Sequence, residues 1–162
     1  MLSKKLTDAL SGQINKELAS AYLYLGMAVH FETEGLPGFA HWLKTQAKEE
    51  MGHAMKIYEF IFAAGSTPSL AKIDAPKTKY GKPEKVVEEI LKHEQFVTDS
   101  INKLYELALA EKDYKTQTFL VWFINEQVEE EESVRDILDR FKYTGTSGCG
   151  LMILDKELGE RK

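Results

Sequence analysis

Hydrophobic residues recur along most of this chain every three or four positions, the spacing that places side chains on one face of an α-helix. The first such series includes Leu6, Leu10 and Ile14, and three later stretches repeat the pattern. Proline is strongly disfavoured inside helices, and the prolines fall between these stretches, at Pro37, Pro68, Pro76 and Pro83. The pattern therefore predicts four long helices, separated by segments that contain proline.

Residues suited to helix ends mark the boundaries of these elements. Ser3 and Asp113 can act as N-caps, Pro83 suits a first helical turn, and Gly65 suits a C-cap. A glycine-rich stretch at 145–150 predicts a break before a last short helix. The predicted helices span about 4–35, 38–64, 83–111, 114–143 and 151–158. No run of residues shows the alternating pattern of a β-strand.

The segment 65–83, between the second and third helices, is long for a connection inside a compact domain. A helix of about 28 residues is ~42 Å long, and about eighteen extended residues reach up to ~60 Å. The segment can therefore run the length of a bundle and leave the third helix parallel to the second. We expect an all-α fold in one domain over 1–162: a four-helix bundle over about 4–143 with one long crossover, plus a short C-terminal fifth helix.

Composition and charge exclude several classes of protein. The chain of 162 residues has a formal net charge of −5, whereas general nucleic-acid binding needs a basic surface. The longest stretch without Lys, Arg, Asp or Glu is 18–31, shorter than the ~20 apolar residues of a membrane span. The single Cys149 excludes an internal disulfide framework, and the first residues show no apolar signal segment. We expect a cytoplasmic protein that binds neither nucleic acid nor membrane.

Polar residues interrupt the apolar stripe of each predicted long helix. Apart from Gln46, every interruption lies within about three residues of its helix midpoint, or ~5 Å along the axis. Midpoints meet at one level whichever way the helices run. We therefore expect one polar layer in the centre of the bundle, formed by Glu17, Glu50, His53, Glu94, Gln127 and Glu130.

Four carboxylates at one level of a protein core cannot all stay ionised without cations. Two divalent cations would balance the four glutamates of the layer, and His53 and Gln127 add neutral donors. Glu50 and His53 are three positions apart, which places both on one face of the second helix. Carboxylate and imidazole ligation without thiolate suits iron or manganese, with zinc as a competitor.

With these residues in view, the sequence resembles the non-haem ferritins of prokaryotes over essentially its whole length. The resemblance is carried by Glu17 with Tyr24, by EEMGH at 49–53, by Glu94 and by NEQVEEE at 125–131. Ferritin-like di-iron proteins are well-known bundles of this architecture. The resemblance implies iron storage, and it implies a ferroxidase, an enzyme that oxidises Fe(II) with O2 or peroxide at paired sites before the ferric product is stored.

The resemblance also implies a role for each site residue. The first iron would be bound by Glu17, Glu50 and His53, with Glu50 bridging, and the second by Glu94 and Gln127 with Glu130 close by. Tyr24 would donate an electron or a hydrogen bond near the iron, although a plain core tyrosine explains it as well. The fifth helix would line a channel in a hollow cage of 24 chains. Some relatives have a third iron site, whose matching residues are Glu49, Glu126, Glu129 and Glu130.

Several alternatives remain open at this stage. The acidic run 126–132 is typical of a solvated helix face, and a helical bundle without metal would leave the glutamates structural. A di-iron oxidoreductase or peroxidase that stores nothing would use the same centre. A haem-binding protein of the bacterioferritin type would use Met51, but such proteins carry a second Glu-x-x-His motif, which Gln127 to Glu130 replaces here. Haem is therefore not expected as a cofactor.

Overall fold

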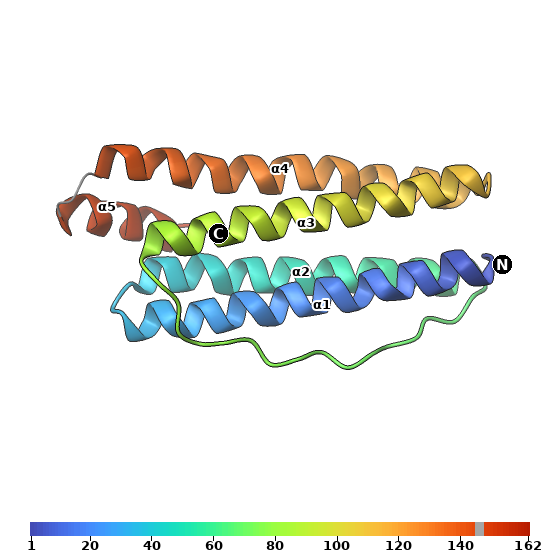
Figure 1. The fold of residues 1–162 in the computed structure, drawn as a ribbon, viewed down its shortest axis with the longest axis horizontal. Helices are drawn as coiled ribbons and strands as arrows, with labels where there is room; N and C mark the ends of the chain where they lie inside the picture. Colours follow the sequence, from blue (N-terminus) through green and yellow to red (C-terminus); the bar gives the residue numbers. More distant parts are fainter. Residues whose placement is uncertain (145–147) are drawn as a thin grey trace.

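The computed structural model describes residues 1–144 and 148–162, and within these ranges the chain contains five helices and no strand. Four long helices lie side by side along the molecule, and a short helix lies at one end (Figure 1). The elements are α1 (Lys4–Thr33), α2 (Pro37–Ala63), α3 (Pro83–Ala110), α4 (Tyr114–Thr144) and α5 (Gly148–Gly159). This confirms the expected all-α fold: a helical bundle with a short C-terminal helix.

The helices begin and end at the residues that the sequence indicates. Ser3 Oγ accepts a hydrogen bond from Leu6 N–H at 3.1 Å and caps α1. Asp113 Oδ1 caps α4 in the same way, accepting from Thr116 N–H at 2.9 Å. Pro83 stands at the first position of α3, where its missing N–H leaves no bond unmade. Gly65 follows α2 with φ +78°, a left-handed conformation that glycine adopts without strain.

The connection between α2 and α3 crosses the whole length of the bundle, so these two helices run in the same direction (Figure 1). It is attached to α1 by hydrogen bonds from Ser69 N–H to Ser11 Oγ (3.1 Å) and from Tyr80 N–H to His30 Nδ1 (3.3 Å). The crossover passes so close to α1 that a Cβ at Gly26 would lie 2.6 Å from a backbone oxygen of the crossover. Glycine is therefore required there for packing.

The apolar core is divided into two clusters. One cluster lies toward the α5 end and includes Phe31, Phe39 and Trp42, while the other lies toward the opposite end and includes Leu10 and Phe123. The two clusters are separated along every long helix by buried polar side chains, namely Glu17, Glu50, His53, Glu94, Gln127 and Glu130. The predicted polar layer is therefore a feature of the fold.

The short helix α5 begins earlier than the sequence predicts. Residues 148–150, expected to belong to the glycine-rich break, form its first turn, while residues 145–147 lie outside the described ranges. A Cβ at Gly150 would lie 2.6 Å from the Thr144 carbonyl oxygen, so this glycine serves the close approach of α5 to α4. Cys149, expected in a turn, is an exposed residue of the same helix.

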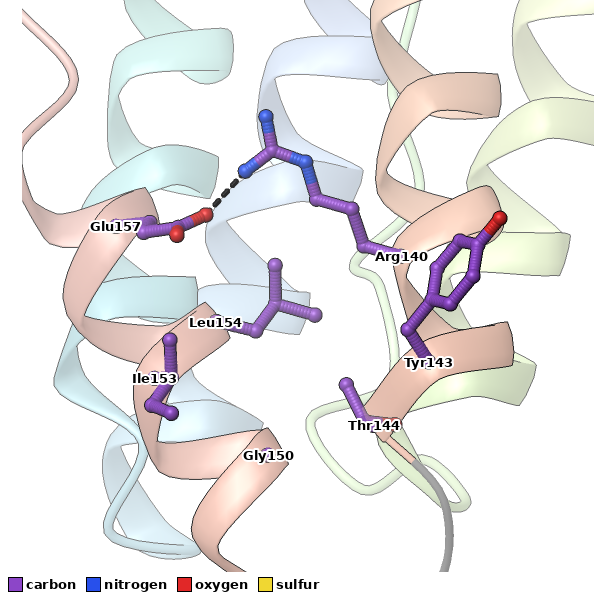
Figure 2. A pocket seen from close by; sticks show the side chains of 7 residues that line it. All are labelled: Arg140, Tyr143, Thr144, Gly150, Ile153, Leu154 and Glu157. Atoms are coloured by element: carbon purple, nitrogen blue, oxygen red, sulfur yellow. Dashed lines mark hydrogen bonds and ion pairs between the residues drawn. The ribbon is translucent and has the colours of Figure 1, made fainter.

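A surface cavity of about 570 Å³ lies where α5 meets the end of α4 (Figure 2). Leu154 lies at its floor, and Arg140 of α4 forms an ion pair across it with Glu157 of α5. No residue of the polar layer lines this cavity. Among the described residues, no helix is apolar over a length sufficient to cross a membrane.

Candidate metal centre

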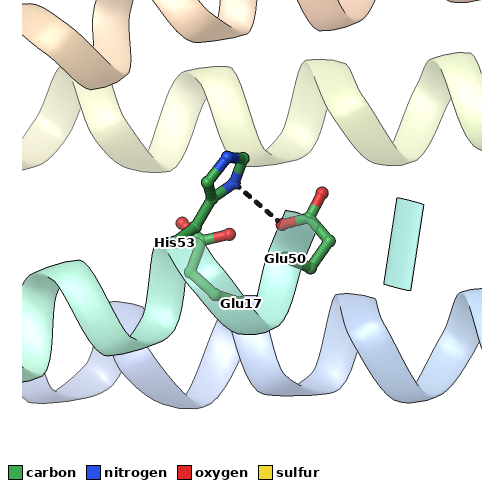
Figure 3. Close-up of side chains that lie close together, drawn as sticks. All are labelled: Glu17, Glu50 and His53. Carbon is green, nitrogen blue, oxygen red and sulfur yellow. Dashed lines mark hydrogen bonds and ion pairs between the residues drawn. The ribbon is translucent and has the colours of Figure 1, made fainter. Parts of the chain in front are cut away.

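Three side chains from α1 and α2 form the first group of potential metal ligands. One ligand atom each from Glu17, Glu50 and His53 lie within 4.8 Å of one another, and all three side chains are buried. Figure 3 shows Glu17 rising from α1 toward the two α2 residues, with His53 Nδ1 3.3 Å from Glu50 Oε2. The spacing of three residues on α2 directs Glu50 and His53 to the same point. This arrangement can hold a cation.

A hydrogen-bonded chain from α3 fixes the orientation of Glu17. Gln13 Nε2 donates to Glu17 Oε1 at 2.8 Å, and Gln13 Oε1 accepts from Ser100 Oγ at 2.6 Å. The other oxygen, Glu17 Oε2, is buried and has no hydrogen-bond partner. Buried polar atoms are normally satisfied, so this free oxygen fits a position reserved for a metal ion.

A second group of potential ligands shares His53 with the first. Its members are His53, Glu126 and Glu130, whose ligand atoms again lie within 4.8 Å of one another. His53 Nε2 lies 3.7 Å from Glu126 Oε1. Glu130 Oε2 accepts a hydrogen bond from Gln46 Nε2 at 2.8 Å. The imidazole of His53 therefore stands between carboxylates of α2 and of α4.

Glu94 lies in the same layer but is engaged differently. Its carboxylate accepts hydrogen bonds from Tyr24 O–H and, at 3.2 Å, from Gln127 Nε2. Among the described residues it belongs to neither group of converging ligand atoms. The structure thus brings Glu94, Gln127 and Tyr24 together as one hydrogen-bonded set beside the two groups.

The four residues matched to a third iron site are not brought together as one set. Glu126 and Glu130 belong to the group that contains His53, and Glu129 is exposed and lies outside both groups of the described residues. Glu49 instead forms an ion pair with Arg161, with 3.1 Å between Glu49 Oε2 and the guanidinium. This arginine could not be recognised from the sequence, because it lies far from Glu49 along the chain.

Burial and mutual repulsion keep protons on the carboxyl groups of the layer. Burial, followed by the nearby Glu50, raises the pKa of Glu17 from 4.5 to about 8. Burial and then Glu94 raise the pKa of Glu130 to about 7 and that of Glu50 well above its usual value. Burial also raises the pKa of Glu94. Divalent cations would replace these protons, because a metal ligand must be deprotonated.

Met51, the residue that a haem-binding protein would use, lies on α2 directly after Glu50. Its side chain is about half exposed and lines a surface cavity of about 600 Å³, together with Ala21 and Leu25 of α1. The residue thus lies on the surface of α2, whereas Glu50 and His53 on the same helix are buried.

The bundle of long helices has a core that is interrupted by glutamates and one histidine. These features are typical of one class of protein, the carboxylate metal proteins built on helical bundles. Within this class, the family model "Ferritin-like domain" matches residues 7–144. The chain belongs to the ferritin-like family.

Individual relatives match nearly the whole chain. A bacterial non-heme ferritin of Bacteroides fragilis (strain 638R) is 43% identical over 161 residues, which cover 99% of this chain and 100% of the relative. A bacterial non-heme ferritin of Escherichia coli O157:H7 is 35% identical over 158 residues, 98% of this chain and 96% of the relative. Both names favour the non-haem alternative over a haem-binding protein.

Solved structures agree with the same assignment. The open pore ferritin from the archaeon Archaeoglobus fulgidus is 41% identical, covers 100% of both chains and superimposes with a TM-score of 0.98. A humanized archaeal ferritin is 42% identical, covers 100% of this chain and 99% of the other, and gives the same TM-score. The fold is therefore ferritin-like, as the sequence predicts.

Proposed function

We propose that this protein stores iron and oxidises Fe(II) to Fe(III) at a pair of sites inside each chain. One observation carries the proposal: four glutamates and a histidine are buried at one level of the bundle, and Glu17 Oε2 has no hydrogen-bond partner. Among the described residues, no lysine or arginine forms an ion pair with Glu17, Glu50, Glu94 or Glu130. Metal ions are the counter-charges that such a layer needs.

In this proposal, iron is the substrate and the chain supplies the two positions. Glu17, Glu50 and His53 bind the first Fe(II), and Glu94, Gln127 and Glu130 bind the second, with Glu50 bridging. Two Fe(II) ions give one electron each to O2, which takes up two protons and leaves as hydrogen peroxide. Because both electrons leave together, no one-electron oxygen radical is released. Gln127 would present its amide oxygen to the metal, and its hydrogen bond to Glu94 would then be exchanged.

Tyr24 is placed to assist the second position. Its hydroxyl donates to Glu94, and burial with the nearby Glu94 raises the pKa of Tyr24 well above its usual value. The phenol therefore keeps its proton, and we propose that its hydrogen bond orients Glu94; an electron that it gives to oxygen near the iron would be accompanied by transfer of its hydroxyl proton to Glu94. The variant Tyr24→Phe distinguishes this role from plain core packing, because phenylalanine keeps the ring in the core but lacks the hydroxyl that donates to Glu94.

Storage requires many copies of the chain. The relatives that show the family of this chain are named as ferritins. We propose that this protein likewise associates with itself into a hollow cage of 24 chains, in which ferric mineral forms. Acidic residues on the inner wall would attract cations and favour nucleation. A cytoplasmic location accords with the free Cys149.

The decisive experiment adds Fe(II) to the purified protein in air, at many equivalents per chain, and measures the soluble iron that sediments with protein. We expect iron far above three ions per chain in a large particle, and loss of rapid oxidation in the double variant Glu50→Ala/Glu94→Ala. The matched control is Glu59→Ala/Glu106→Ala, which removes two exposed glutamates from the same helices. Two or three ions per chain on a small species would support a non-storing di-iron oxidoreductase instead.

A further inference from the structure

Arg161, two residues after the end of α5, contacts α2 at three residues. His41 Nε2 lies 2.7 Å from the backbone oxygen of Arg161. The guanidinium of Arg161 donates to Gln46 Oε1 through one nitrogen and to both oxygens of Glu49, at 3.1 and 3.2 Å, through the other. Arg161 therefore contacts α2 from His41 to Glu49, the residue that precedes Glu50 of the polar layer.

The packing of α5 fixes this path. A Cβ at Gly38 would lie 1.6 Å from the Asp155 carbonyl oxygen, and an added Cβ at Gly159 would lie 3.4 Å from Gly38 Cα. Asp155 Oδ1 also accepts a hydrogen bond from Phe39 N–H at 2.9 Å. The start of α2 and the end of α5 are in backbone contact, so the chain leaves α5 beside α2. Arg161 is therefore close enough to Glu49 to form the ion pair.

Arg161 also acts on the centre through Gln46. Since Gln46 Oε1 accepts from the guanidinium, its Nε2 faces Glu130 and donates at 2.8 Å. The guanidinium can only donate hydrogen bonds, so the Gln46 amide must turn its oxygen toward Arg161 and its nitrogen toward Glu130. Glu130 belongs to the group of potential ligands around His53. Arg161 therefore holds Glu49 directly and restrains Glu130 through one intervening amide.

We propose that Arg161 competes with metal ions for Glu49, one of the four glutamates matched to a third iron site, and so keeps that site unassembled. The inference rests on the proposed function, because it concerns iron near the proposed di-iron centre. While the guanidinium occupies both oxygens of Glu49, that carboxylate cannot bind a cation. A metal ion beside it would also be repelled by the positive charge. A third ion therefore gains Glu49 as a ligand only when Arg161 leaves, which its side-chain exposure of 30% permits.

The test is an anaerobic titration with Co(II), a divalent ion that O2 does not oxidise readily, followed by calorimetry and by visible absorption. The wild-type chain should bind two ions tightly and a third weakly. In Arg161→Gln we expect the third ion to bind about tenfold more tightly, equivalent to about 1.4 kcal/mol. In Arg161→Lys the gain should be smaller, because an ammonium keeps the charge but cannot bind Glu49 and Gln46 together.

Two further variants make the result specific. Arg140→Gln removes the arginine of α4 that pairs with Glu157 of α5. Arg140 contacts neither Glu49 nor Gln46, so this variant should bind Co(II) as the wild type does. Arg161→Gln/Glu49→Gln should lose the gain, since the released carboxylate is gone. Circular dichroism and thermal unfolding of each variant establish that the bundle is folded.

The outcomes separate this inference from the proposed function. If the wild type binds the first two ions and Arg161→Gln binds the third no better, the competitor role is overturned while the di-iron centre stands. A gain that persists in the double variant also overturns it, because Glu49 would then not be the released ligand. If the wild type binds no pair of ions, both proposals fall together.

Discussion

His53 is the residue on which the geometry of the centre converges. One ring nitrogen faces Glu50 and the other faces Glu126, so the imidazole takes part in both groups of potential ligands. The ring is also enclosed by aromatic side chains, with Trp122 and Phe123 in edge-on contact at centroid distances of 5.5 and 6.0 Å. The imidazole therefore links ligand candidates of α2 and α4 and packs against the aromatic side chains of α4.

Replacing His53 by alanine should therefore slow the rapid phase of Fe(II) oxidation strongly while leaving self-association intact. We expect a loss of roughly 100-fold or more, since even the outer-sphere partners of metal ligands are worth about 10- to 100-fold. The measurement is the initial oxidation rate at two Fe(II) per chain, with sedimentation of the same sample. His30→Ala is the control, because His30 is equally buried, at 6%, but binds the crossover. A variant that dissociates yet oxidises iron normally would contradict both halves of the expectation.

At the scale of elements, α5 packs closely against both α2 and α4. It meets α2 where Gly38 leaves room for the backbone of Asp155, and it meets α4 where Gly150 approaches Thr144. The ion pair between Arg140 and Glu157 is about half exposed on both sides, so it adds little. The close approach of α5 to its two neighbours therefore requires a glycine at both contacts.

Gly38→Ala should displace α5 from α2. The added methyl group would overlap backbone atoms of Asp155, and overpacking of this kind costs about 1–3 kcal/mol. We expect faster amide hydrogen exchange in 148–159, with unchanged exchange in the polar layer. Gly12→Ala, in the interior of α1 with nothing within 4 Å of its new Cβ, should instead stabilise the protein by about 0.5–1 kcal/mol. Equal exchange in α5 of the Gly38 variant and the wild type would show that the contact is not needed.

Much of the fold, but less of the centre, could be predicted from the sequence. The long helices and the crossover follow from proline positions, caps and periodicity, which are local properties of the chain. The start of α5 could not be predicted, because Gly148 and Gly150 are poor helix formers, and the close approach of Gly150 to Thr144 of α4 is a contact that the local sequence does not reveal. Gln13 and Arg161 were missed as well, since their partners lie on other helices and periodicity carries no information about such pairs.

Considered as a whole, the molecule consists of two apolar clusters joined through a polar layer that opposes folding when metal is absent. Unfolded chains release the protons of glutamates near the usual pKa of 4.5, but the folded protein holds those of Glu17 until about 8 and of Glu130 until about 7. Between the usual pKa of 4.5 and these raised pKa values, the folded state binds more protons than the unfolded state. Stability must therefore fall as pH rises.

The metal-free protein should thus be most stable toward the acidic side of this window. We expect the urea midpoint to fall between about pH 5 and pH 8, because ionising a buried, unpaired carboxyl group destabilises the folded state. Saturating Co(II) should remove the decline, and Glu17→Gln, which cannot ionise, should flatten it. A midpoint of the metal-free wild type that rises steadily over this window would show that other groups dominate.

The crossover has a consequence for how the chain can be divided. The α1–α2 hairpin carries Glu17, Glu50 and His53, and the α3–α4 hairpin carries Glu94, Gln127 and Glu130, so each half of the polypeptide brings half of the donor atoms. If the backbone were cut near residue 74, the two fragments would each present an incomplete set of ligands and an uncovered apolar face. We expect them to recombine only weakly on their own and much more tightly with Co(II), measured by fluorescence-labelled fragment association. The metal would then act as a cross-link between two polypeptides.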